Sequence, residues 1–247
     1  MASHLCSALL GLAVIDSRAE EPDVVRQFSS LIDPSQTVRE NAEAELLRKD
    51  GAELARQLAD LMGTKAGPKV IEAGLLVLAK KDALRIGELL PSALRYPSAG
   101  VRSVALAMVP PSAVSGNITA LVSSALADQD VIVRLRAADL LRGRGRDEDA
   151  IQVAIEALGS DTPDVLGDPP RPAFIIARSM LIASNERGLV VQALDRAVSE
   201  VGLQPSPIKY RLLDLRAYLS GKSADLIYNH VGPPTTQERN SLDRLQK

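Results

Sequence analysis

A helical register that recurs six times is the feature that most constrains this chain. The stretches DQDVIVRLRAADLL (128–141) and DPSQTVRENAEAELL (33–47) both place a Val-Arg pair five residues after an Asp and then an Ala and a Leu. With the Arg of this pattern as position zero, the spacings between successive units are 31, 32, 32, 40 and 35 residues. The residues at position zero are Arg39, Val70, Arg102, Arg134, Phe174 and Lys209.

Two further positions of the register show what it encodes. Three residues after position zero an Ala stands in five of the six units, with Leu212 as the exception. Seven residues after it, Leu or Val stands in five units, with Arg216 as the exception. These positions share one stripe of a helix, and the small residue in the middle lets a neighbouring helix approach closely. Each unit therefore predicts a buried helix.

The starts of these helices are also marked in the sequence. In three units a proline stands two residues before position zero, which suits the first turn of a helix because proline lacks an N–H. These prolines are Pro68, Pro172 and Pro207. The other units carry residues that can cap a helix, namely Asp33 before Pro34, Ser98 before Val101 and Asp130 before Val131.

Another apolar-periodic stretch precedes each predicted helix, so each unit is a helix-turn-helix. These stretches cover residues 24–32, 54–62, 84–94, 118–126, 151–158 and 189–201. A single helix pair cannot bury its apolar face alone, and repeated pairs supply the missing cover by stacking. The sequence therefore predicts an array of six stacked pairs.

The composition agrees with an all-α chain and restricts its chemistry. Of the 247 residues only two are Phe, four are Tyr and none is Trp, so small aliphatic side chains must fill the core. With one Cys and two His, neither a disulfide nor a Cys- or His-based metal site can form within the chain, and we expect no catalytic residue and no cofactor. The net charge is −2, and the basic stretch 141–146 is followed at once by three acidic residues, so nucleic-acid binding is not expected.

The Asp-Pro turn, the Val-Arg pair that opens the second helix and the Ala three residues later resemble the HEAT-repeat family. Units of 31 or 32 residues are most similar to the short HEAT repeats of the phycobilin-lyase-like type. The resemblance covers about residues 23–221, within a predicted solenoid domain of residues 20–221, and is strongest in units one and four. Armadillo and tetratricopeptide repeats fit less well. It implies an all-α fold, a right-handed α-solenoid (superhelix) of about six HEAT-like helix pairs.

The resemblance also implies roles for the charged residues of the motif. Asp33, Arg39, Asp128 and Arg134 are expected to form an internal ladder, in which each Asp accepts backbone N–H groups and each Arg pairs with an Asp of its own or the next unit. A carboxylate at a helix start is favoured by unpaired N–H donors there. Asp168 repeats the Asp position but faces Phe174, so any ladder is interrupted in unit five.

The function that we expect is a non-catalytic scaffold that binds another protein or a peptide segment. The resemblance implies that the second helices line the concave side, and their positions outside the buried stripe then form the contact surface. These are Glu40, Asn41, Ser103, Arg136 and Asp139. The alternative is an enzyme or enzyme accessory, since HEAT-like families include bilin lyases and alkylated-base glycosylases. Oligomeric state is not encoded in any pattern of this sequence.

Three segments lie outside the regular repeat. Residues 1–19 hold an apolar run followed by Ser-Arg-Ala. Two interpretations fit: a secretory signal peptide, which implies an exported or periplasmic protein, or the capping helix of a cytoplasmic protein. The first interpretation is favoured because the run has almost no polar face, and it is too short to span a bilayer. Residues 159–173 contain four prolines and form either a passive insertion or part of a binding face. Residues 222–247 predict a short helix and a flexible tail.

Overall fold

The computed structural model describes residues 23–64, 66–164, 166, 169–202, 206–222, 235–237 and 240. The expectations for residues 1–19 and for nearly all of 222–247 fall outside these ranges, as does the one for Asp168. Within them the regular elements are helices, and no strand is present apart from one isolated bridge. The all-α prediction is therefore confirmed for the part of the chain that the structure describes.

The helices follow the predicted register in pairs. The first helices of the pairs are α1 (Asp23–Ser29), α3 (Gly51–Met62), α5 (Ile86–Ala93), α7 (Gly116–Ser124), α9 (Asp147–Ala157) and α11 (Arg187–Glu200). The second helices are α2 (Gln36–Arg48), α4 (Pro68–Asp82), α6 (Ala99–Met108), α8 (Val131–Leu141), α10 (Ala173–Ile182) and α12 (Pro207–Leu219). Short 3-10 turns, η1 (Ser30–Ile32), η2 (Ala83–Arg85), η3 (Pro111–Ala113) and η4 (Ala125–Ala127), adjoin or link them.

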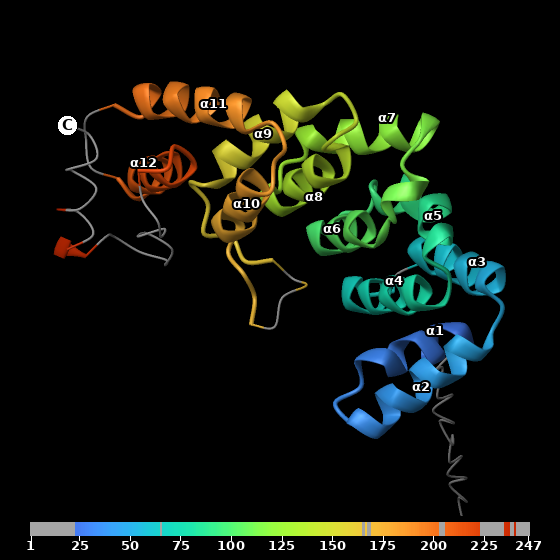
Figure 1. Cartoon of the computed structure of the whole chain (residues 1–247). Coiled ribbons are helices and arrows are strands. Elements are labelled where there is room, and N and C mark those ends of the chain that lie inside the picture. The colour runs from blue at the N-terminus through green and yellow to red at the C-terminus, as the bar shows by residue number, and fades with distance from the viewer. Residues whose placement is uncertain are drawn as a thin grey trace, which may run out of the picture.

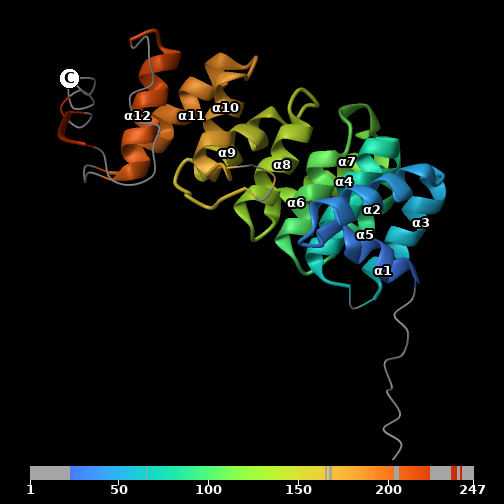
Figure 2. The same cartoon turned by 90° about the horizontal axis from the view of Figure 1, so that it is seen from below.

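Two layers of helices run along the molecule. Each second helix from α2 to α8 packs against the next one, up to α10, while α3, α5 and α7, and likewise α9 and α11, pack in the other layer. Figure 1 and Figure 2 show the helices following one another in chain order along an elongated, curved body. Each helix after the first pair therefore contacts mainly its neighbours in the sequence, as expected for stacked pairs.

The predicted stripe is buried. The alanines three residues after position zero lie against neighbouring helices, and those of α6, α8 and α10 are fully covered. The Leu or Val seven residues after position zero is buried in every unit that has one. In α8, Val133, Ala137 and Leu141 join the core formed with the preceding helices, whereas Ile132 and Leu135 join the core formed with the following ones. Because α8 is covered on both sides, seven of its 11 residues are buried.

The helix starts follow the prediction in part. The carboxylate of Asp130 caps α8 by accepting the backbone N–H groups of Ile132 and Val133, at 2.9 and 3.1 Å. Asp33 and Ser98 do not cap a helix with their side chains, so this prediction is wrong. Because Pro34 and Ser35 separate Asp33 from α2, its carboxylate accepts the N–H of Ser35 at 2.8 Å and closes the turn before the helix.

Candidate interaction surface

The arginines at position zero hold the turn that precedes their own helix. Arg39, Arg102 and Arg134 each donate from Nη1 to the backbone carbonyls six and five residues earlier. For Arg102 the accepting oxygens belong to Tyr96 and Pro97, at 3.0 and 2.9 Å. A side chain on the first turn of the second helix thus satisfies carbonyls that the turn leaves without partners. The same contact in three units shows what the repeated Val-Arg pair does.

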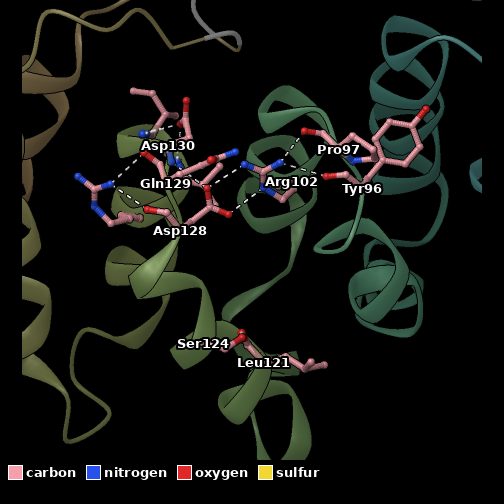
Figure 3. Close-up of polar contacts among 11 residues, drawn as sticks. Tyr96, Pro97, Arg102, Leu121, Ser124, Asp128, Gln129 and Asp130 are labelled. Atoms are coloured by element: carbon pink, nitrogen blue, oxygen red, sulfur yellow. Dashed lines mark hydrogen bonds and ion pairs between the residues drawn. The ribbon is translucent and has the colours of Figure 1, made fainter.

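Arg102 also reaches the next unit. Its Nε and Nη2 donate to the two carboxylate oxygens of Asp128, both at 2.8 Å, so that the guanidinium lies between its own turn and the turn before α8 (Figure 3). Burial of Asp128 raises its pKa, but the hydrogen bonds from Arg102 and from the N–H of Asp130, with the charges of Arg102 and Arg134, bring the pKa below its ordinary value. The pair is therefore held in its ionised form.

These contacts correct the ladder that was expected from the sequence. Arg39 and Arg134 contact the backbone carbonyls of Asp33 and Asp128, and neither makes an ion pair with the carboxylate of its own unit. The predicted pairing of an Arg with the Asp of the next unit is present for Arg102 of α6, which pairs with Asp128 in the turn before α8. Asp33 and Asp128 use their carboxylates to close the turns. All four residues therefore have structural contacts in this fold.

The structure distributes the five predicted partner-binding residues over three helices and does not bring them together. Glu40 and Asn41 are exposed on α2, where Glu40 accepts a hydrogen bond from Gln36. Ser103 keeps only 2% of its surface exposed, so its assignment to the surface is wrong. The reason is that α4 and α8 both pack on α6 and cover it from two sides.

The two remaining residues lie on α8 and already have partners within the chain. Asp139 is exposed and accepts from Nη2 of Arg142 at 2.8 Å. Arg136 is partly buried and forms an ion pair with Asp164, whose side chain is 5% exposed. Arg136 is therefore not free for a partner, and its ion pair connects α8 to the loop between α9 and α10.

This loop is ordered around Asp164 by backbone contacts. Pro163 and Pro172 form an isolated antiparallel bridge, and the N–H of Asp164 donates to the carbonyl of Arg171 at 2.8 Å. Leu166 packs against the core of the preceding helices. Figure 1 shows the loop leaving α10 on the side of the molecule formed by the second helices. The loop therefore lies on the surface formed by the second helices. In the sequence, Asp164 inside the proline-rich stretch was the feature that could have indicated this.

A hollow of about 500 Å³ lies between this loop and α10. Ile175 and Ile176 line it from the helix, and they are only partly buried. The loop contributes Leu166 and three prolines, and Arg136, Asp164, Arg171 and Ser179 supply the polar groups. The lining therefore combines apolar walls with charged and polar side chains, and it can contact both apolar and charged groups of a ligand.

Protein-family models, curated proteins and solved structures were searched for similarity to this chain, and none matched. Within the part that the structure describes, no group of three or more Asp, Glu, His or Cys side chains is placed to hold a metal ion. The same residues include no helix with the length and apolar character that crossing a membrane requires.

Proposed function

We propose that the chain is a right-handed α-solenoid of six HEAT-like helix pairs, and that it serves as a non-catalytic platform for a peptide segment of another protein. The repeated register, the pairing of the helices and the packing of each second helix on the next support this architecture. The partner binds on the side of the second helices, which the proline-rich loop borders. The enzyme alternative stays a prediction.

The observation that carries this proposal is the hollow between the loop and α10. Ile175 and Ile176 remain partly exposed there although α10 packs against α8, α9 and α11. Partner side chains that cover them gain about 25 cal/mol for each Å² of apolar surface removed from water. The prolines add walls that lose little conformational freedom when a peptide is bound.

The charges at the hollow favour a particular kind of peptide. Two guanidinium groups, those of Arg136 and Arg171, stand against the single carboxylate of Asp164. Arg136 is paired with Asp164, whereas Arg171 is exposed at the rim. The lining therefore carries one unbalanced positive charge, and a segment with apolar side chains next to an Asp or Glu fits it best. Asp139, Glu40 and Asn41 on the same side stay predicted contacts.

A peptide-display selection against the purified full chain tests this proposal. We expect it to enrich sequences in which apolar residues flank an acidic one, and we expect Ile175→Asp to abolish their binding. Ile182→Asp is the matched control, because Ile182 is exposed on the same helix two turns further on and does not line the hollow. Binding that survives Ile175→Asp, or that both variants abolish equally, contradicts this site.

A further inference from the structure

A second groove lies in the other layer of the molecule, between α9, α11 and the start of α12. Its volume is about 570 Å³. The floor is apolar: Ile155 and Leu212 are buried at its base, and Ala197, Val201 and Ile208 are partly buried along it. The groove shares no lining residue with the hollow beside the proline-rich loop. It therefore forms a separate surface that the proposed function does not use.

Small residues on α11 keep this groove open. Ala193 and Ala197 stand four residues apart, one turn above the other on the same face of the helix, and both line the groove. Side chains of this size leave Ile208 of the neighbouring helix α12 partly exposed along the groove. The groove thus runs past Ala193 and Ala197 of α11 and is apolar at its base.

The rim of the groove is strongly acidic. Glu148, Asp149, Glu156 and Glu200 line it, against one basic side chain, Arg196. Asp149 pairs with Arg146, and Glu156 accepts a hydrogen bond from Gln152. Glu148 and Glu200 are exposed, and their carboxylates have no hydrogen bond or ion pair with another residue that the structure describes. The lining of the groove therefore carries an excess of negative charge, and α9 contributes it, because Arg196 and Glu200 of α11 balance each other.

The helix dipole accounts for the positions of only two of these four carboxylates. Glu148 and Asp149 stand in the first turn of α9, where the helix dipole favours negative charge. Glu156 stands in the last turn of α9 and Glu200 is the last residue of α11, where the dipole disfavours it. These two glutamates destabilise their own helix ends slightly and lie on the same apolar groove. The helix dipole therefore does not account for their placement.

We infer that this groove binds a basic amphipathic segment of a partner protein. Its apolar side chains lie on the floor formed by Ala197, Val201 and Ile208, while its Lys or Arg side chains reach the carboxylates of Glu148, Glu156 and Glu200. This is the helix-in-groove mode of recognition, in which apolar residues three and four apart face the groove. Exposed charge pairs are screened by salt, so the affinity falls as ionic strength rises.

The test uses the full chain and a fluorescent synthetic helical peptide with Leu at positions spaced three and four apart and Lys elsewhere. Its companion carries Glu in place of every Lys. In fluorescence anisotropy we expect the Lys peptide to bind and the Glu peptide not to bind. The double variant Glu156→Lys with Glu200→Lys raises the Kd for the Lys peptide by about tenfold or more, since several exposed charge pairs turn repulsive together.

Two further variants separate this groove from general attraction between opposite charges. Glu45→Lys with Glu88→Lys makes the same change of charge on α2 and α5, where both residues are exposed and outside the groove, and leaves the Kd within about twofold. Ala197→Leu fills the floor without any change of charge and weakens binding. Failure of the wild-type chain to bind the Lys peptide overturns the inference, as does equal loss in the two double variants or undiminished binding by Ala197→Leu. None of these outcomes bears on the loop hollow.

Discussion

Arg102 joins two successive turns of the helix array through the carboxylate of Asp128. Its guanidinium forms two hydrogen bonds of 2.8 Å to that carboxylate and two more to the carbonyls of Tyr96 and Pro97. The two side chains keep 7% and 13% of their surface exposed. Arg102 thus holds the turn that precedes α6 and fixes its position relative to the turn that precedes α8. The Arg102–Asp128 pair therefore controls how units three and four stack.

Replacing Arg102 by Ala is expected to lower the free energy of unfolding by about 3 kcal/mol, because it leaves a largely buried carboxylate without its charged partner. Denaturant unfolding followed by circular dichroism measures this change. Arg134→Ala is the matched control: Arg134 also holds its turn through two carbonyls but has no carboxylate partner, and its loss costs about 1 kcal/mol. Equal losses in the two variants contradict the special role of the Arg102–Asp128 pair.

The lowered pKa of Asp128 predicts a pH dependence. Its pKa in the folded chain lies below that in the unfolded chain, so the stabilisation is fully present above about pH 4, the unfolded value. It is lost as the pH falls through the folded pKa. We therefore expect the difference in unfolding free energy between the wild type and Asp128→Asn to shrink as the pH is lowered below that value. A difference that stays constant down to strongly acidic pH contradicts this assignment.

The ion pair between Arg136 and Asp164 is expected to hold the proline-rich loop on α8. Asp164→Leu leaves Arg136 unpaired in a partly buried position, which costs about 3 kcal/mol. It also accelerates amide hydrogen exchange at the N–H of Leu166 in the loop and of Ala173 at the start of α10. Adding Arg136→Met removes the uncompensated charge and recovers most of the stability. If the double variant is no more stable than Asp164→Leu, the pair does not carry this energy.

The sequence predicted the helices and the buried stripe well because both depend on local periodicity. Ala137 and Leu141, for example, lie where their spacing from Arg134 placed them. The contact between Arg136 and Asp164 could not be predicted in this way, since it joins residues 28 positions apart through a loop without a repeat. The groove at α9 and α11 also depends on how two helices that are distant in sequence pack together.

Ser103 shows the same limit within a helix. The register assigns one buried stripe to each helix and leaves Ser103 outside it. In the array α6 is packed on one side by α4 and on the other by α8, so residues of both faces are covered. Small side chains are what such a double contact requires, and a repeat pattern read from a single helix cannot indicate it.

Because Ser103 is buried, its replacement by Ala is predicted to stabilise the chain, whereas the preceding substitutions are predicted to destabilise it. Its hydroxyl oxygen is buried and has no hydrogen-bond partner among the residues that the structure describes. Ser103→Ala removes this hydroxyl from an apolar contact and introduces the better helix former, so we expect stability to rise by up to about 1 kcal/mol. Ser98→Ala is the control at a partly buried helix start whose hydroxyl makes no capping bond, and we expect a smaller change there. Thermal and denaturant unfolding measure both, and a loss of stability in Ser103→Ala means that the hydroxyl has a partner that holds α6 in place.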